Sequence, residues 1–535
     1  MLKNIPHPGV ALRNYLNSRY PLTPTKLTAM AQAINLDIGG DASLHSGNTR
    51  GKIAHIAQVA PGPKCERTLA LITKALRSLE IPFFLGGGTA HGEITINILQ
   101  QDIWAFLAAI QQWLSIDPDV LIETQARKPV RVTKLGSMFG TTPPEMLRIF
   151  CVENYGGERK ELIAACSYIT INVWAAVTNY SGDTIYESGL TTPYAKRLRH
   201  KTIDAFLKNK ASFESCSLDV MSTPKFPIDI VYTWVNDQDE DWNNQRVARA
   251  VEVHKSVRAH NLERWKNRDE LRFSLRSVAM FAPWVRNIFI VTSGQIPDWL
   301  NDTNPRVKIV PHAEIWKNPE SLPTFNSSGI ETQLHHIKDL SEHFLYFNDD
   351  FFLGSFCTPD DFFLPNGVMK YFPSDQRVFE PDIDETSEEY IFADFNAINL
   401  LKEKYGQYGR EIMQHIPYPS RKSLLERLES EFQSAFDRCA GEPFRSRNDI
   451  RPIAFLQYHA GLQEGLAVPS GISHRYLALW KPAIAKQFSG VASTRRYKTF
   501  CINDVGVTIE RQNEVDKLVV DFLEVYYPFK SEFEK

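Results

Sequence analysis

The 535-residue chain has few cysteines, and the few it has are widely separated. No two of them form a Cys-x-x-Cys pair, and their number is odd: Cys65, Cys151, Cys166, Cys216, Cys357, Cys439 and Cys501. This pattern argues against a disulfide framework and against a structural zinc site. We therefore expect reduced thiols, as in a cytosolic protein.

A strong charge of one sign and a long hydrophobic run are also absent. The formal net charge of −3 predicts no surface for a polyanion, so no nucleic-acid partner is expected and any anion site must be local. The longest apolar-rich stretch, Ile103 to Leu114, is too short to span a bilayer. Residues 1–20 lack the pattern of a secretion signal. We expect a cytoplasmic protein, with peripheral association at the inner face of the membrane left open.

Length and ordinary globular composition predict two domains. Residues 1–220 are expected to form an α+β accessory domain, with a helix over 65–79, strands over 81–85, 94–98 and 168–177, and a tight turn at Gly86-Gly87-Gly88. We find no chemical motif in this part, so acceptor-chain recognition and oligomerisation both stay open as its role. The polar stretch from Ser215 to Pro227, with two prolines, is the predicted linker.

The sequence pattern changes in the second part, residues 221–510, where predicted strands alternate with helices. A helix and a charged tail follow over 511–535. Strands predicted over 228–235, 287–292 and 307–310, and a further one from Phe344, alternate with helices such as 269–280. Alternation of this kind favours a mostly parallel sheet covered by helices. An acidic surface loop or lid is expected at 374–390 and one amphipathic helix over 423–436.

The most informative segment runs from Phe344 to Phe352. Apolar residues typical of a buried strand enclose Asn348, Asp349 and Asp350. Adjacent carboxylates there are costly unless a cation, a proton or hydrogen bonds hold them. Open α/β sheets bind ligands where their strands end, which favours a site for a metal ion and a nucleotide. The alternative is a strand that ends in a solvated turn.

Two further strands end in Asn-Asp. The first, from Ile228, leads through Thr233 and Trp234 to Asn236 and would seat a nucleotide, although a core position for Trp234 is the more frequent outcome. The second ends in Asn503 and Asp504, whose oxygen atoms could complete the shell of a hard cation such as Mg²⁺.

Charged pairs at helical spacing form a third group. Arg272 and Arg276, four residues apart, could clamp a diphosphate, while the neighbouring acids suit the helix dipole. Glu331 and His335 have the same spacing and could face one site, with a surface ion pair as the alternative.

A histidine and two arginines complete the candidates. His415 precedes two prolines and is therefore held in an extended segment, which suits a catalytic base. Arg445 and Arg447, two apart in an extended segment, would project to the same side and contact phosphate, with solvated arginines as the alternative.

Taken in order, these blocks resemble the four characteristic regions of the Stealth family of sugar-phosphate transferases. The resemblance covers about half the chain, from near Ile228 to near Asp504. Departures are small: Asn236-Asp237 replaces a common Gly or Ser, Arg268 a common Asn, and His336 a common Arg. The expected fold class is α/β, with a Rossmann-like (GT-A-like), mostly parallel sheet covered by helices and an N-terminal α+β accessory domain.

The resemblance implies transfer of hexose-1-phosphate or N-acetylhexosamine-1-phosphate from a nucleotide sugar, expected to be UDP-linked, to a hydroxyl of a saccharide acceptor. Mg²⁺ or Mn²⁺ is the expected cofactor, and membrane export machinery and a second copy of the chain are candidate partners. The implied catalytic residues are His415 as base, Glu331, Asp350, Arg276, Arg445 and Arg447. The implied donor-binding residues are Thr233, Trp234, Asn236, Asp269, Arg272 and Asn326. The implied metal ligands are Asn348, Asp349, Asp350, Asn503 and Asp504.

Two other functions fit parts of the pattern. A metal-dependent glycosyltransferase would use the same acidic pair but would release a nucleoside diphosphate instead of the monophosphate. A non-catalytic carbohydrate-binding protein would retain the blocks as packing, and the 11% aromatic content suits sugar stacking.

Overall fold

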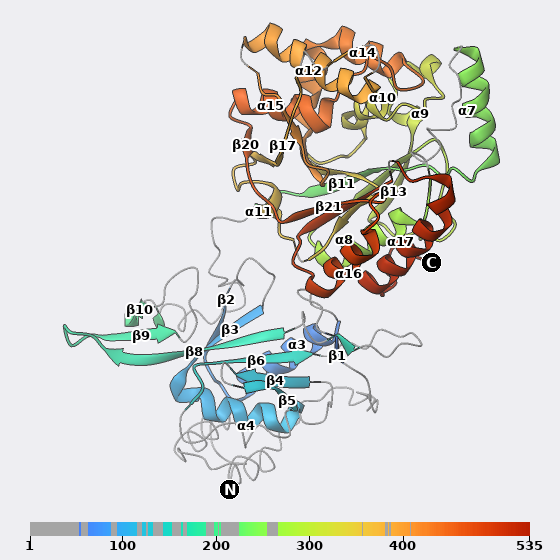
Figure 1. The fold of residues 1–535 in the computed structure, drawn as a ribbon. Coiled ribbons are helices and arrows are strands. Elements are labelled where there is room, and N and C mark those ends of the chain that lie inside the picture. Colours follow the sequence, from blue (N-terminus) through green and yellow to red (C-terminus); the bar gives the residue numbers. More distant parts are fainter. Residues whose placement is uncertain are drawn as a thin grey trace. The chain divides into compact units, whose positions relative to one another are not determined.

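A computed structural model describes residues 53–54, 63–86, 94–114, 120–124, 127–131, 143–151, 162–163, 168–188, 197–201, 203–204, 224–253, 266–355, 357–379, 383–384, 387–406, 408–504 and 506–535. The chain separates into two compact units, Met1–Met221 and Ser222–Lys535 (Figure 1). Most of the predicted linker, and all of the predicted glycine turn except Gly86, lie outside the described residues.

The first unit is an α+β structure built on an eight-stranded sheet. Its described elements are β1 (Ile53–Ala54), α3 (Pro63–Ser78), β2 (Phe83–Gly86), β3 (Ile94–Leu99), α4 (Ile103–Leu114), β4 (Val120–Thr124), β5 (Arg127–Arg131), β6 (Met146–Cys151), β7 (Leu162–Ile163), β8 (Tyr168–Thr178), β9 (Thr184–Ser188) and β10 (Arg197–Arg199). The predicted helix and all three predicted strands are present. The apolar run that is too short for a membrane forms α4, which is buried in the core from Ile103 to Ile110.

The second unit contains a five-stranded sheet in the order β13-β12-β11-β14-β19. Its strands are β11 (Ile228–Thr233), β12 (Ile288–Thr292), β13 (Val307–Pro311), β14 (His343–Asn348) and β19 (Tyr418–Arg421). The first four in spatial order run parallel, and β19 pairs with β14 in the antiparallel sense. Strands β11, β12 and β14 are buried almost throughout, as their continuous apolar sequence requires.

Three smaller sheets flank this one, in a unit that is mixed α/β. A three-stranded sheet has the order β15 (Phe351–Leu353), β22 (Thr499–Asn503) and β21 (His474–Ala478). The other two are pairs: β16 (Met369–Tyr371) with β20 (Ala467–Pro469), and β17 (Pro373–Arg377) with β18 (Glu411–Met413). Because β14 is followed after two residues by β15, the chain passes from the central sheet into the three-stranded one at Asp349 and Asp350.

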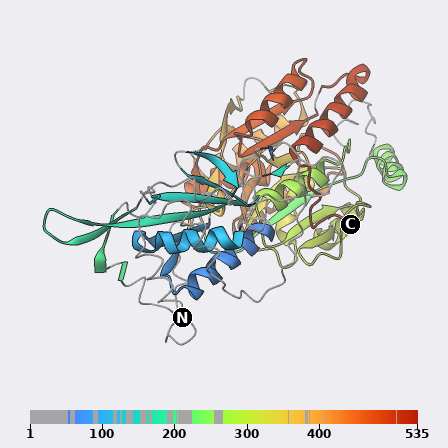
Figure 2. The ribbon, with the colours of Figure 1, turned by 90° about the horizontal axis from the view of Figure 1, so that it is seen from below.

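Helices lie on both sides of the strands of this unit. They are α7 (Glu240–Glu252), α8 (Glu270–Phe281), α9 (His312–Ile315), α10 (Ser327–Glu331), α11 (Pro359–Phe362), α12 (Glu389–Tyr405), α13 (Lys422–Glu431), α14 (Gln433–Gly441), α15 (Gln457–Gln463), α16 (Ile484–Thr494) and α17 (Gln512–Tyr526), with a 3₁₀ turn η5 (Leu334–His336) and a π-helical turn η7 (Pro452–Leu456). Figure 1 shows α8, α16 and α17 on one side and α10, α12, α14 and α15 on the other. Helices α16 and α17 lie side by side (Figure 2), with Phe488 stacked on Phe522.

Two segments differ from their predictions. The single helix expected over 423–436 is two helices, α13 and α14, which meet at Phe432. The span contains neither glycine nor proline, so the sequence carried no sign of a break. The acidic loop expected at 374–390 begins in β17, which pairs with β18, and ends in the first turn of α12, while residues 380–382 and 385–386 lie outside the described residues. In the part of the chain that the structure describes, none of the helices has both the length and the apolar character needed to cross a bilayer.

Candidate functional site

The parallel strands of the central sheet bring their predicted polar residues to one edge. Thr233 lies beside Asn348 in the register of β11 and β14, and its hydroxyl is 3.1 Å from that of Tyr346. Asn236 is fixed by Gln295, which accepts from its backbone N–H and donates to its carbonyl. Trp234 is buried, so the more frequent outcome, a core tryptophan, is the one observed.

Four carboxylates gather where this edge meets the three-stranded sheet. Burial away from water raises the pKa of Asp349 well above its usual value, and the charges of Asp350 and Glu270 raise it further. Shielding from water also raises the pKa of Asp350 to about 7, although the Cys501 thiol donates to its Oδ2 at 3.3 Å and acts in the opposite direction. Burial raises the pKa of Glu270 and of Asp504 as well. Burial is the largest cause in all four, and the charges of neighbouring carboxylates add to it for Asp349, Asp350 and Asp504.

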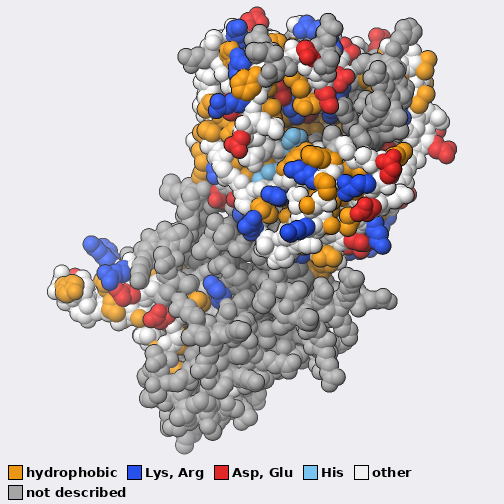
Figure 3. All heavy atoms as spheres, viewed as in Figure 1, with side chains coloured by type: hydrophobic (Ala, Val, Ile, Leu, Met, Phe, Trp, Pro, Cys, Tyr) orange, Lys and Arg blue, Asp and Glu red, His pale blue; other side chains and the backbone are white. Residues whose placement is uncertain are grey.

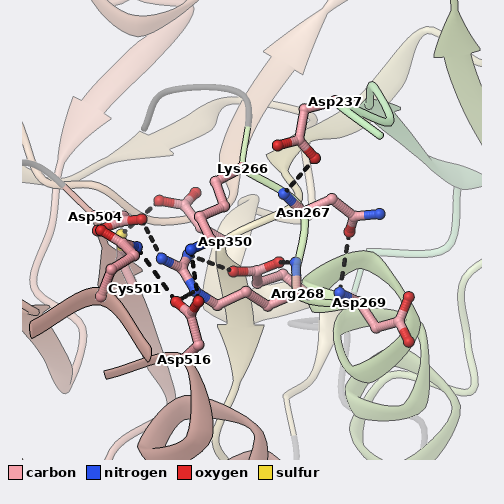
Figure 4. A network of polar contacts seen from close by, with 11 residues as sticks. Asp237, Lys266, Asn267, Arg268, Asp269, Asp350, Cys501, Asp504 and Asp516 are labelled. Atoms are coloured by element: carbon pink, nitrogen blue, oxygen red, sulfur yellow. Dashed lines mark hydrogen bonds and ion pairs between the residues drawn. The ribbon is translucent and has the colours of Figure 1, made fainter. Parts of the chain in front are cut away.

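One arginine at the N-terminal end of α8 offsets part of this charge (Figure 4). Arg268 is buried and binds the carboxylates of Glu270, Asp504 and Asp516, the last at 2.6 Å. Lys266 also contacts Asp516, at 2.5 Å. Because Asp516 belongs to α17, this network joins the C-terminal helix to the edge of the central sheet.

The predicted metal ligands fit a hard cation in their chemistry. Among the described residues, Oδ1 of Asp350 and Oδ1 of Asp504 are buried without a hydrogen-bond partner. Carboxylate and amide oxygens are the ligands that Mg²⁺ and Ca²⁺ take. Among the described residues, one group of three has its ligand atoms at the spacing of a metal site, and it consists of His335, His336 and Glu429. The aspartates do not form such a group. The aspartates therefore suit a hard cation in the type of their donor atoms and in their charge, but not in the spacing of those atoms.

Glu331 lies in a second charged group, close enough to Tyr346 for its charge to raise the pKa of that tyrosine. Burial raises its pKa to about 7, although the charges of Arg451 and Arg445 lower it. Among the described residues its Oε2 has no hydrogen-bond partner, and the backbone N–H of Ile453, in the π-helical turn η7, donates to the carboxylate. Such turns are frequent at functional sites. The Arg451 guanidinium itself binds the buried Asp394, at 3.1 and 3.2 Å.

His415 lies in a bend between β18 and β19, where the backbone N–H of Ile416 donates to the carbonyl of Gln414, and not in the extended segment that its prolines predicted. Burial, then the charge of Arg451, lowers its pKa to about 4, so the ring is neutral at pH 7. Its ring lies 5.4 Å from that of Tyr476 on β21, between centroids. Figure 3 shows histidine side chains of the second unit at the surface beside hydrophobic ones.

Two tyrosines connect the groups around Asp350 and Glu331. Burial raises the pKa of Tyr418, and the charge of Arg451 lowers it. The charges of Glu331 and Asp350 both raise it further. Tyr346 is stacked on Tyr418, with ring centroids 6.2 Å apart. Burial raises its pKa well above the usual value, and the charges of Glu331 and Asp349 raise it further. The carboxylate cluster and Glu331 are therefore close enough for their charges to act on the same pair of tyrosines.

Arg272 and Arg276 contact a different carboxylate. Glu534, near the C-terminal end, accepts from Nε of Arg272 at 2.6 Å and from Nε and Nη2 of Arg276 at 2.9 and 2.8 Å. Arg276 also donates to the carbonyl of Tyr527. The geometry therefore gives no support to the predicted diphosphate clamp.

The other two predicted arginines are separated by a turn. Asp449 accepts from the backbone N–H of Ser446 and tightens the chain there, so the extended geometry that would aim both arginines to one side is lost. Arg445 binds the hydroxyl of Ser327 at 2.9 Å, and Arg447 lies over the ring of Phe392.

Three other predicted residues have structural partners. Asn326 caps α10 through Ser328 and donates to Asp449. Asp269 stands at the N-terminal end of α8 with a φ of 63°, and Asn267 holds its backbone N–H. Helix α10 ends at Glu331, so His335 does not share a helical face with it and instead binds Glu429.

Several site residues were missed by sequence reasoning: Arg268, Cys501, Asp516, Asp394 and Arg451. Glu270 was assigned only a helix-dipole role. Arg451 directly follows a predicted block and could have been included with it. Asp516 and Asp394 are acids on helices with no local pattern to distinguish them from solvated ones.

The same segments match known conserved regions. Residues 226–250 match Stealth protein CR1, conserved region 1; residues 264–371 match CR2, conserved region 2; residues 414–461 match CR3, conserved region 3; and residues 489–535 match CR4, conserved region 4. The fourth region thus includes α17 and Glu534.

Similar proteins include an exopolysaccharide phosphotransferase of Streptomyces coelicolor, 42% identical over 324 residues, which are 60% of this chain and 54% of that protein. The exopolysaccharide phosphotransferase CpsY of Mycobacterium tuberculosis is 34% identical over 60% of this chain and 61% of its own length. The chain thus spans little more than half the length of these relatives. Mouse xyloside xylosyltransferase 1 matches 53% of this chain and 99% of its own with a TM-score of 0.28 and 10% identity, too slight a likeness to carry an argument.

A shorter relative is matched over most of its length. The capsular polysaccharide phosphotransferase of Haemophilus influenzae is 36% identical over 317 residues, which are 56% of this chain and 84% of that protein. With this match and all four conserved regions present in order, the chain belongs to the Stealth family.

Proposed function

We propose that the chain transfers a sugar-1-phosphate from a nucleotide sugar to a hydroxyl of a saccharide, in the synthesis of a capsule or exopolysaccharide. The observation that supports this most is the cluster of buried carboxylates after β14, with Glu331 and His415 both within reach of the Arg451 charge. Relatives named polysaccharide phosphotransferases support it. Phosphoryl transfer depends on positioning and charge neutralisation more than on covalent chemistry, and the site offers both.

The donor diphosphate binds at the carboxylate cluster in this proposal. Asp349, Asp350 and Asp504, with Asn348 and Asn503, would hold Mg²⁺ or Mn²⁺. The cation, when bound, neutralises charge on the diphosphate. Arg268 holds Asp504 in place, and Thr233 and Asn236, at the ends of β11, border the nucleotide, for which a uridine is expected.

The acceptor hydroxyl binds on the side of His415 and Glu331. The neutral imidazole of His415 takes the hydroxyl proton as the oxygen attacks phosphorus. An O–P bond forms to the acceptor, the O–P bond to the nucleotide breaks, and nucleoside monophosphate leaves. Glu331 orients the acceptor, and Arg451, held by Asp394, supplies positive charge for the phosphate oxygens.

The wider setting is part of the same proposal. A GT-A-like, mostly parallel sheet in the second unit carries the chemistry, while the first unit recognises the acceptor chain or a second copy. The protein acts in the cytoplasm, with peripheral association at the membrane where the polysaccharide is exported.

Asp350→Asn tests the assignment. We expect this variant to lose sugar-phosphate transfer from UDP-sugars while its thermal unfolding stays close to that of the wild type, since only a charge is removed. Asp302→Asn, at an exposed turn, is the matched control and should keep wild-type activity. Wild-type activity in Asp350→Asn would refute the role of the cluster.

A further inference from the structure

A second cluster of ligating side chains lies outside the site described above. It consists of His335, His336 and Glu429, where η5 packs against α13. The Nε2 atoms of both histidines approach Oε2 of Glu429, at 2.9 and 3.0 Å. His335 is fully buried, and the His336 and Glu429 side chains are 21% and 6% exposed. Three ligand atoms within 4.8 Å of one another is the spacing a metal ion needs.

The hydrogen bonds of His336 define what its Nε2 must carry. Its Nδ1 lies 2.9 Å from the carbonyl oxygen of Ile315, which can only accept, so Nδ1 is protonated. In a neutral ring, Nε2 would then present a lone pair to the Glu429 carboxylate, which also only accepts. Two acceptors at this distance repel each other, so Nε2 either bears a proton or binds a cation.

Several features favour the cation. Histidines that bind metals commonly donate their other ring N–H to a backbone carbonyl, as His336 does to Ile315. Lys317 holds the second oxygen of Glu429, Oε1, at 2.8 Å, which leaves Oε2 for the histidines. Such outer contacts orient ligating carboxylates. Lys317 is 53% exposed, so its charge is well solvated.

We propose that His335, His336 and Glu429 bind one Zn²⁺ ion. Two imidazoles and one carboxylate form a set that zinc accepts in proteins, with a fourth position for water. The expectation that a zinc site is absent concerned thiolate ligands and does not bear on this set. Bound zinc would tie η5, which begins three residues after Glu331, to α13, and so would stabilise the segment that carries Glu331.

Zinc content measures the proposal directly. The full-length protein is stripped with a chelator, reloaded with Zn²⁺, desalted and analysed by mass spectrometry of the metal. His336→Arg removes one ligand while its guanidinium can still bind Glu429, so the fold should persist. His200→Arg is the control, because His200 is exposed and pairs only with Asp204 among the ion pairs described. Circular dichroism verifies that both variants are folded.

We expect the wild type and His200→Arg to retain one more zinc ion per chain than His336→Arg. Zinc titration should give a dissociation constant at least about tenfold weaker in His336→Arg. Zinc should also raise the unfolding temperature of the wild type more than that of the variant. Equal zinc content in all three proteins would overturn the proposal and leave a proton-bridged network of His336 and Glu429.

A measurement on the wild type alone guards against a variant that fails to fold. Co²⁺ replaces Zn²⁺ in sites of this kind and gives visible absorption bands that depend on its geometry. Bands of a four-coordinate N/O site, displaced by one equivalent of Zn²⁺, are expected. Their absence would refute the site independently of any substitution.

Discussion

Glu534 provides a quantitative test of the roles of Arg272 and Arg276. Its side chain is 1% exposed and accepts hydrogen bonds from both arginines and from Ser531. Against the cost of burial, these partners lower its pKa from 4.5 to about 2. A shift of this size corresponds to about 3 kcal/mol of stability. Glu534→Gln should therefore reduce the free energy of unfolding by about 3 kcal/mol at pH 7.

The pH dependence follows from the direction of the shift. Because the folded pKa lies below the unfolded one, the stabilisation is complete above pH 4.5 and is lost as the pH falls toward 2. The difference between wild type and Glu534→Gln should therefore be constant between pH 6 and 7 and shrink below about pH 4.5.

Urea unfolding monitored by circular dichroism and tryptophan fluorescence gives the comparison. Glu532→Gln is the matched control, since Glu532 pairs with Arg306 but is 52% exposed. We expect that control to cost less than about 1 kcal/mol. If Glu534→Gln costs no more than Glu532→Gln, the carboxylate does not hold the two arginines, and a diphosphate clamp by Arg272 and Arg276 becomes credible again.

Three further predictions concern the site. Cys501→Ala removes a hydrogen bond that lowers the pKa of Asp350, so the acid limb of the pH–rate profile should move to higher pH; an unmoved limb would contradict this. Glu331→Gln should lower turnover by about 10²-fold or more without loss of thermal stability, as measured by initial rates and calorimetry, and normal turnover would remove Glu331 from the site. Asp394→Asn leaves the Arg451 charge without its partner and should cost about 3–5 kcal/mol in chemical unfolding; a cost below 1 kcal/mol would show that Arg451 is otherwise compensated.

Local patterns predicted the strands that carry the site. The apolar runs that end in Asn348, Thr233 and Asn503 are all strands, and they end where the polar residues begin. This works because a buried strand needs a continuous apolar run, whereas its end is marked by residues that must reach solvent or a ligand. The extended setting expected of His415 is not found, because the chain bends at residues 415 and 416 before β19 begins.

Long-range pairs could not be predicted. Arg268 meets Asp516 across 248 residues, and Arg276 meets Glu534 across 258. Their spacing predicted that Arg272 and Arg276 lie on one face of a helix, but it could not predict that Glu534 binds them both. The pairing expected of Glu331 with His335 is wrong because α10 ends at Glu331, and no glycine or proline after that residue marks the end.

The identity of the released nucleotide tests the central claim most directly. The purified protein is incubated with Mg²⁺, UDP-sugars and oligosaccharide acceptors, and the products are separated and weighed by mass spectrometry. The account predicts release of UMP and an acceptor heavier by a sugar and a phosphate. Release of UDP, with an acceptor heavier by the sugar alone, would contradict it and identify a glycosyltransferase.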